Sequence, residues 1–235
     1  MPGMPPPASD ERQTLLEFLR FNQSAFFAVA YGLADEHARS KPSVSALSIG
    51  GLIKHATGVQ KSWAQRAASA PDSPPRDDRP IEEMMAEYAD QYVMRDDETV
   101  AQLLDELRKQ NEETLRVIAD ADLDTPVPVP HDVPWFPQDI DHWSVRWVAL
   151  HLIEELSRHA GHADIIRESI DGATMYELMA ANEEWPETHW MKRWKPAVSS
   201  GSVMYITQCR LSESVPSIAF SRYEHSNRRH HHPDT

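Results

Sequence analysis

The chain has 235 residues, of which 40% are hydrophobic, and a formal net charge of −14 at pH 7. This length suits one domain with extensions or at most two small domains, and the hydrophobic content is enough for a core. The negative charge argues against a nucleic-acid backbone or an anionic membrane surface as partner, because no basic face is evident in the sequence.

Two helices are predicted in the first third of the chain. Residues 9–11, Ser-Asp-Glu, have the composition of an N-terminal cap and precede a helix whose apolar side holds Leu15, Phe18, Leu19, Phe26, Phe27 and Tyr31. Lys-Pro-Ser at residues 41–43 interrupts the helical pattern. A second helix is expected from Ser45 or Ser48 to about Ala70, with an apolar side of Leu52, Ala56, Val59 and Trp63.

The middle of the chain alternates helices with proline-rich connections. Residues 71–80 are predicted to be a surface loop, and a short helix over residues 81–93 follows. The acidic residues 96–98 precede the next helix, where negative charge is favourable for the helix dipole, and that helix continues to about Ala121. Residues 122–142 are too rich in proline for a helix, so we expect an irregular segment across one end of the helices.

The most informative pattern is the helix that Ser144 caps and that ends at Asp171-Gly172. At about 100° per residue, its inward arc holds Val148, Leu152, Leu156, Ala163, Ile166 and Ile170. Glu155 and His159 fall inside this apolar arc, and His151 and His162 lie at its edge. The expected core face of this helix therefore contains a carboxylate and imidazoles.

A carboxylate in a core is unfavourable unless a partner compensates its charge. Glu155 and His159 are one helical turn apart, so their side chains can converge on one point. A metal ion bound there would satisfy both side chains. A hydrogen-bonded buried pair without metal is the alternative that this spacing leaves open.

Four main helices with connections at their ends predict an all-α protein, an up-and-down four-helix bundle with an irregular loop at one end. We expect a flexible N-terminus over residues 1–8, one bundle domain over residues 9–196 and a disordered tail over residues 197–235. Within this tail, the triplet His230 to His232 is expected to bind metal only adventitiously, and Cys209 is expected to be inert.

The numbers of cysteine and glycine residues exclude further classes of protein. One cysteine excludes an internal disulfide framework and favours a cytoplasmic location. Glycine is scarce, and no glycine-rich phosphate loop is present. No apolar run approaches about 18 residues, and residues 1–8 lack the pattern of a signal peptide, so we expect neither a membrane span nor secretion.

Several other polar and aromatic residues have a structural interpretation that we favour. Three tryptophans near the helical pattern, Trp63, Trp143 and Trp147, are expected in the core or in a pocket wall. His151 is expected to be a hydrogen-bonded histidine rather than a ligand. Arg146 and Arg158 are surface arginines by default, with an acidic substrate or a thiol as the alternative partner.

Three stretches together resemble a known superfamily. They are residues 47–55 (Leu-Ser-Ile-Gly-Gly-Leu-Ile-Lys-His), residues 120–124 (Asp-Ala-Asp-Leu-Asp) and residues 144–164, and Asp-Gly-Ala-Thr at 171–174 also fits. As a set they resemble the DinB / mycothiol-dependent maleylpyruvate isomerase-like superfamily, in particular its mini-circle protein branch. The resemblance covers roughly residues 11–196.

The resemblance implies a DinB-type bundle with a divalent metal between its second and last helices. By position, His55 matches the ligand of the second helix, and Glu155 and His159 match the pair on the last helix, with Glu155 as in the mycothiol-dependent type. Where the family usually has Arg-Gly-Gln, this chain has Ala160-Gly161-His162, so His162 is left open as a second-sphere contact or a fourth ligand. No catalytic residue beyond these is implied.

Three protein ligands with an open position are typical of catalytic zinc, and two histidines with one carboxylate also match non-haem iron(II) sites. We expect zinc, with Ni²⁺ or Fe²⁺ as alternatives. The resemblance implies a thiol transferase or isomerase that activates a low-molecular-weight thiol, mycothiol by analogy, toward an electrophilic substrate. It also implies a homodimer.

Two other functions remain open at this stage. One is a non-catalytic, metal-binding stress-response bundle in which the metal serves stability. The other is an iron enzyme of the kind that DinB-like domains support when fused to a larger catalytic partner, although no such partner domain is recognisable here.

Overall fold

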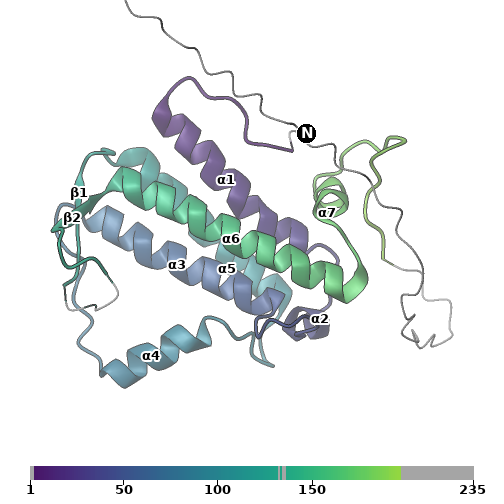
Figure 1. Ribbon diagram of the computed structural model, residues 1–235, viewed down its shortest axis with the longest axis horizontal. Helices are drawn as coiled ribbons and strands as arrows, with labels where there is room; N and C mark the ends of the chain where they lie inside the picture. The colour runs from purple at the N-terminus through teal and green to yellow at the C-terminus, as the bar shows by residue number, and fades with distance from the viewer. Residues whose placement is uncertain (1–2, 132, 134–135, 197–235) are drawn as a thin grey trace, which may run out of the picture. The chain divides into compact units, whose positions relative to one another are not determined.

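A computed structural model describes residues 3–131, 133 and 136–196 (Figure 1). These residues lie in the first of the chain's two compact units, Met1–Pro196. The predictions of a disordered tail, of adventitious metal binding at His230 to His232 and of an inert Cys209 concern residues outside the described part.

Four long helices form the body of the described unit: α1 (Glu11–Val29), α3 (Ile49–Ser69), α5 (Val100–Asp120) and α6 (Val145–Asp171). Helix α6 packs against α1 and α3, and α5 packs against the same two helices, which closes the bundle (Figure 1). The prediction of an all-α bundle of DinB-like type is confirmed. The packing of α3 directly on α6 is what places the candidate ligands of the two helices next to each other.

The helices begin and end where the sequence supplies capping groups. The Ser48 side chain accepts a hydrogen bond from the Gly51 amide at the start of α3, and Ser144 caps α6 in the same way. Thr99 forms a capping box at the start of α5. Helix α6 ends at Gly172, whose φ of 75° is the left-handed conformation that glycine adopts without strain.

The core lies between the four long helices and consists of apolar side chains from each of them. Its fully buried large residues include Leu19, Phe26, Leu52, Leu107, Ile118, Leu152, Leu156 and Ile166. A buried amide network crosses this core: Gln23 Nε2 donates to Gln60 Oε1 at 2.7 Å, and Gln60 Nε2 donates to Asn111 Oδ1 at 2.8 Å. This network links α1, α3 and α5 without leaving these amides unpaired.

Two expectations for α1 were wrong. Phe18 is 46% exposed and Tyr31 is 40% exposed, although both were predicted to be buried. Phe18 lies at the edge of the arc that Leu15, Leu19 and Phe26 define. Tyr31 follows the last residue of the helix, so helical periodicity does not govern its position.

The structure contains short elements that the sequence did not predict. They are α2 (Asp35–Arg39), α7 (Met175–Asn182) and two strands, β1 (Pro126–Pro128) and β2 (His142–Ser144). The strands pair antiparallel with Val127 opposite Trp143, so the segment expected to be irregular carries a small sheet at its two ends. The predicted short helix is present as α4 (Ile81–Asp90).

A buried arginine joins the end of α1 to α6, and sequence reasoning missed it. The guanidinium of Arg167 is fully buried, pairs with Asp171 at 2.9 Å and donates to the carbonyl oxygens of Val29 and Tyr31 at 2.7 and 2.9 Å. These partners compensate the charge of a side chain that otherwise could not be buried.

Among the described residues, no helix is both long and apolar enough to cross a membrane.

Candidate metal centre

Three ligand-type side chains from two helices meet inside the bundle. His55 comes from the buried face of α3, one turn after Gly51, and Glu155 and His159 come from adjacent turns of α6. Each of the three offers one donor atom, and these atoms all lie within 4.8 Å of one another. The structure thus brings together the three residues that the sequence singled out.

Glu155 lies between the two imidazoles. Its Oε2 atom is 3.2 Å from His159 Nε2 and 3.8 Å from His55 Nε2. The rings of His55 and His159 meet edge to face, with centroids 4.5 Å apart. His55 is only 5% exposed, while the side chains of Glu155 and His159 are 27% and 21% exposed. The cluster therefore has one buried member and two that reach toward solvent.

The charge of Glu155 is strongly favoured in this position. The interaction with His159, followed by that with His55, holds the pKa of the Glu155 carboxyl well below its usual range, and burial opposes this shift only in part. Glu155 is therefore ionised at neutral pH. A permanently charged carboxylate beside two imidazoles is a donor set that suits a divalent cation.

His55 makes incomplete hydrogen bonds for a buried histidine. Its Nδ1 atom is buried without a partner among the described residues. Its Nε2 atom has only long contacts, 3.4 Å to the Tyr92 hydroxyl and 3.8 Å to Glu155. Buried polar atoms are normally satisfied, so the ring lacks a strong protein partner. The donor set fits a metal ion, which would give Nε2 the strong partner that it lacks.

Tyr92, from the connection between α4 and α5, is a site residue that sequence reasoning missed. Its ring stacks on the His55 ring at 4.3 Å with an interplanar angle of 18°. Burial, together with the neighbouring Tyr88 and the charge of Glu155, raises the pKa of Tyr92, so its hydroxyl keeps its proton. The signal available in the sequence was glycine: Gly51 and Gly58 flank His55 on one face of α3, where a close approach is expected.

An aromatic wall adjoins the other side of Glu155. His151 Nε2 lies 4.0 Å from Glu155 Oε1, and the His151 ring stacks on Trp147 at 4.9 Å and meets Trp63 edge-on at 4.8 Å. Trp147 stacks in turn on Trp143 at 5.0 Å. Trp63 and Trp143 are buried, whereas Trp147 is 39% exposed. The tryptophans thus divide between core and surface, and they fix the ring of His151.

His151, Glu154 and Glu155 form a second group of close ligand-type side chains, although all three belong to one stretch of α6. Glu154 Oε2 lies 3.6 Å from His151 Nδ1 and Glu154 also pairs with Arg158 at 3.4 Å. His162 belongs to neither group of described residues. Its role as a second-sphere contact or a fourth ligand stays a prediction.

Arg146 and Arg158 of α6 have protein partners. Arg146 pairs with Glu11 of α1 at 2.6 Å and with Asp124, which fastens the start of α6 to its neighbours. Arg158 has a side chain that is 79% exposed and pairs with Glu154 on the same helix. Both contacts fit the structural interpretation of these arginines.

Comparison with known proteins identifies the family of this chain. The family model described as mycothiol-S-transferase matches residues 14–172. A solved structure, the conserved protein of a locus from Enterococcus faecalis, is similar over 71% of this chain and 100% of that chain, with 17% sequence identity and a TM-score of 0.47. No curated protein matches the chain. The family match spans more than half of the chain and includes all three candidate ligands, and the chain belongs to the mycothiol-S-transferase family, a DinB-like family.

Proposed function

We propose that this protein transfers the sulfur of a low-molecular-weight thiol to an electrophilic carbon at a metal held by His55, Glu155 and His159. The observation that carries the proposal is the meeting of these three donor atoms, from α3 and α6, within 4.8 Å of one another. Zinc is the expected metal, and mycothiol is the expected thiol because the chain belongs to the mycothiol-S-transferase family.

Each of the three residues has a defined part in holding the cation. The two imidazoles supply neutral nitrogen donors, and Glu155 supplies a negative charge that persists at neutral pH. Three protein donors leave a further position open, which is the arrangement of catalytic rather than structural zinc sites. When bound, a divalent cation lowers the pKa of a thiol, so that the thiolate nucleophile exists at neutral pH.

The reaction balances without any protein nucleophile. The thiol loses its proton to solvent, the sulfur electron pair forms the bond to carbon, and the leaving group departs with the electron pair of the bond that breaks. The single cysteine, Cys209, lies outside the described residues, so no cysteine stands near the site in the described part. We propose that a cosubstrate supplies the thiol.

Metal content tests the centre directly. The purified protein is expected to hold about one equivalent of divalent metal, and Glu155→Ala should lose most of its affinity because a first-sphere donor is removed. The matched control is Glu154→Ala, which removes a carboxylate one residue away whose side chain is 51% exposed. Equal metal content in the two variants would contradict the assignment.

Turnover distinguishes an enzyme from a bundle that binds metal for stability. With zinc and mycothiol, the protein should consume monochlorobimane faster than a His55→Ala variant, with release of chloride. The cobalt-substituted protein should show a sulfur-to-cobalt charge-transfer band when mycothiol is added, because the thiol occupies the open position. Metal binding without this band would favour the non-catalytic alternative.

A further inference from the structure

The connection between α4 and α5 is built into the candidate metal centre. We call residues 91–99 the connector. It lies against the first half of α3, the part of the helix that carries His55, and it presents Tyr92 to that histidine. Sequence reasoning assigned it no function.

Glycines on α3 make room for the connector. A Cβ atom added to Gly51 would meet the carbonyl oxygen of Tyr92 closer than real Cβ atoms approach any atom, and one added to Gly50 would meet the side chain of Met94. A Cβ on Gly58 would lie 2.6 Å from the amide oxygen of Gln91. Only at Gly51 is the obstructing atom backbone, so this glycine lets the connector backbone pack directly on α3, while Gly50 and Gly58 leave room for the side chains of Met94 and Gln91.

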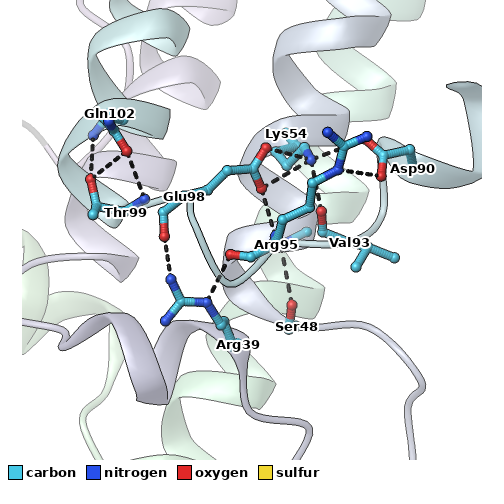
Figure 2. Close-up of polar contacts among 10 residues, drawn as sticks. Arg39, Ser48, Lys54, Asp90, Val93, Arg95, Glu98, Thr99 and Gln102 are labelled. Atoms are coloured by element: carbon cyan, nitrogen blue, oxygen red, sulfur yellow. Dashed lines mark hydrogen bonds and ion pairs between the residues drawn. The ribbon is translucent and has the colours of Figure 1, made fainter.

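Lys54, which precedes His55 on α3, also binds the connector through its side chain. Figure 2 shows its ammonium group among three acceptors: the Val93 carbonyl at 2.8 Å, the Glu98 carboxylate at 2.8 Å and the Asp90 carboxylate at 3.3 Å. The Lys54 side chain is 14% exposed. Arg95 adds a 2.9 Å ion pair to Asp90, so Tyr92 lies inside a segment held at both ends.

The hydroxyl of Tyr92 is aimed at the nitrogen of His55 that faces Glu155. It lies 3.4 Å from His55 Nε2, and the stacked rings fix its position. Its other contact is the hydroxyl of Tyr88 at 3.3 Å, and the Tyr88 side chain reaches solvent. A tyrosine hydroxyl can donate one hydrogen bond.

Metal binding changes the acceptor available to this hydroxyl. A nitrogen of His55 that donates its lone pair to a cation cannot also accept a hydrogen bond from Tyr92. Among the described residues, the remaining polar partner of this hydroxyl is the exposed Tyr88 hydroxyl, and a sulfur atom bound at the centre would be a stronger, charged acceptor. We propose that Tyr92 donates a hydrogen bond to the sulfur of the bound thiol and is therefore a thiol-binding residue; this inference rests on the proposed function.

The test uses the full-length, cobalt-substituted protein and mycothiol as the probe. Tyr92→Phe keeps the ring that stacks on His55 and removes only the hydroxyl. A hydrogen bond to a charged acceptor is lost, so the dissociation constant of mycothiol, measured from the charge-transfer band, should rise about tenfold or more. Cobalt affinity, measured in the absence of thiol, should stay within about twofold. Tyr176→Phe, which removes an exposed hydroxyl on α7, is the matched control and should change neither quantity.

The outcomes separate this inference from the function on which it rests. If wild-type protein gives no charge-transfer band with mycothiol, both are overturned. If wild-type protein and Tyr92→Phe bind mycothiol equally, the assignment of Tyr92 is overturned and the proposed function stands. If cobalt affinity falls as much as thiol affinity, Tyr92 supports His55 instead, and the inference is again overturned. Weaker thiol binding with unchanged cobalt affinity supports it.

Discussion

Asp164 of α6 should make the protein lose stability as pH rises, independently of any metal. In the structure this residue is half-buried and lines a small cavity of about 30 Å³ with residues of α1 and α7, among them Ser24 and Met179. Burial, followed by the charge of Glu168, raises the pKa of Asp164 to about 6. No ion pair or hydrogen bond of its side chain is found within the described residues.

The expected loss of folding stability follows from the shift in the pKa of Asp164. The pKa rises from 3.8 to about 6, and each unit corresponds to about 1.4 kcal/mol, which gives an upper limit of about 3 kcal/mol. Because the carboxyl is partly exposed, solvent screening reduces the effect, and we expect about 1–2 kcal/mol. Below pH about 4 the carboxyl is protonated in both the folded and the unfolded state and imposes no penalty. The penalty accumulates between about pH 4 and pH 6, where the carboxyl is ionised in the unfolded state and protonated in the folded state, and it is complete above pH 6.

Asp164→Asn should therefore leave stability unchanged near pH 4 and raise it near pH 8. Urea unfolding at the two pH values measures the difference, and the melting temperature at pH 8 should rise by about 3–6 °C for a domain of this size. Asp139→Asn is the control, since it removes the same charge from an exposed position. An equal gain at both pH values, or an equal gain in the control, would refute burial as the cause.

Three further perturbations test the packing and the site. Gln60→Leu should lower the free energy of unfolding by about 2–4 kcal/mol in urea titrations, because Gln23 and Asn111 both lose their buried partner; a loss below about 0.5 kcal/mol would contradict the network. Gly51→Ala should destabilise the fold by about 1–3 kcal/mol, because the added Cβ atom would overlap the connector. Gly161→Ala should stabilise the fold by about 0.5–1 kcal/mol, because no atom lies within 4 Å of the added Cβ atom. The melting temperatures of the two variants should therefore shift in opposite directions. Chelation of the metal from protein saturated at about 100 times its dissociation constant should lower stability by about 2.7 kcal/mol, and an unchanged melting temperature would count against a metal in the folded state.

The long helices could be predicted from the sequence because the capping residues and the apolar periodicity that mark them act within a few residues of the chain. The side chains of Ser48 and Ser144 cap the amides that follow them, and Gly172 supplies the left-handed residue at the end of α6. The pairing of Glu155 with His159 was also predictable, since residues four apart on a helix are neighbours whatever the rest of the fold does.

Short elements escaped prediction because tertiary contacts stabilise them. Strand β1 has three residues, two of them proline, and it pairs with β2 through Val127 opposite the buried Trp143. Helix α7 has eight residues and depends on packing against α1, since a helix of that length is marginal alone. The half-burial of Asp164 has the same origin, because α7 covers the cavity that this residue lines.

The sequence by itself determined the four long helices and the carboxylate and imidazole that share one face of α6, because periodicity and capping act within a few residues. His55 was the candidate for a third ligand because it lies near the apolar arc of the second helix, and a family resemblance matched it in position. Only the tertiary structure decided that α3 lies against α6, which brings His55 Nε2 to 3.8 Å from Glu155. It also decided that Tyr92, 37 residues after His55, stacks on that histidine. Contacts between segments so far apart depend on how whole helices pack, and no local pattern encodes them.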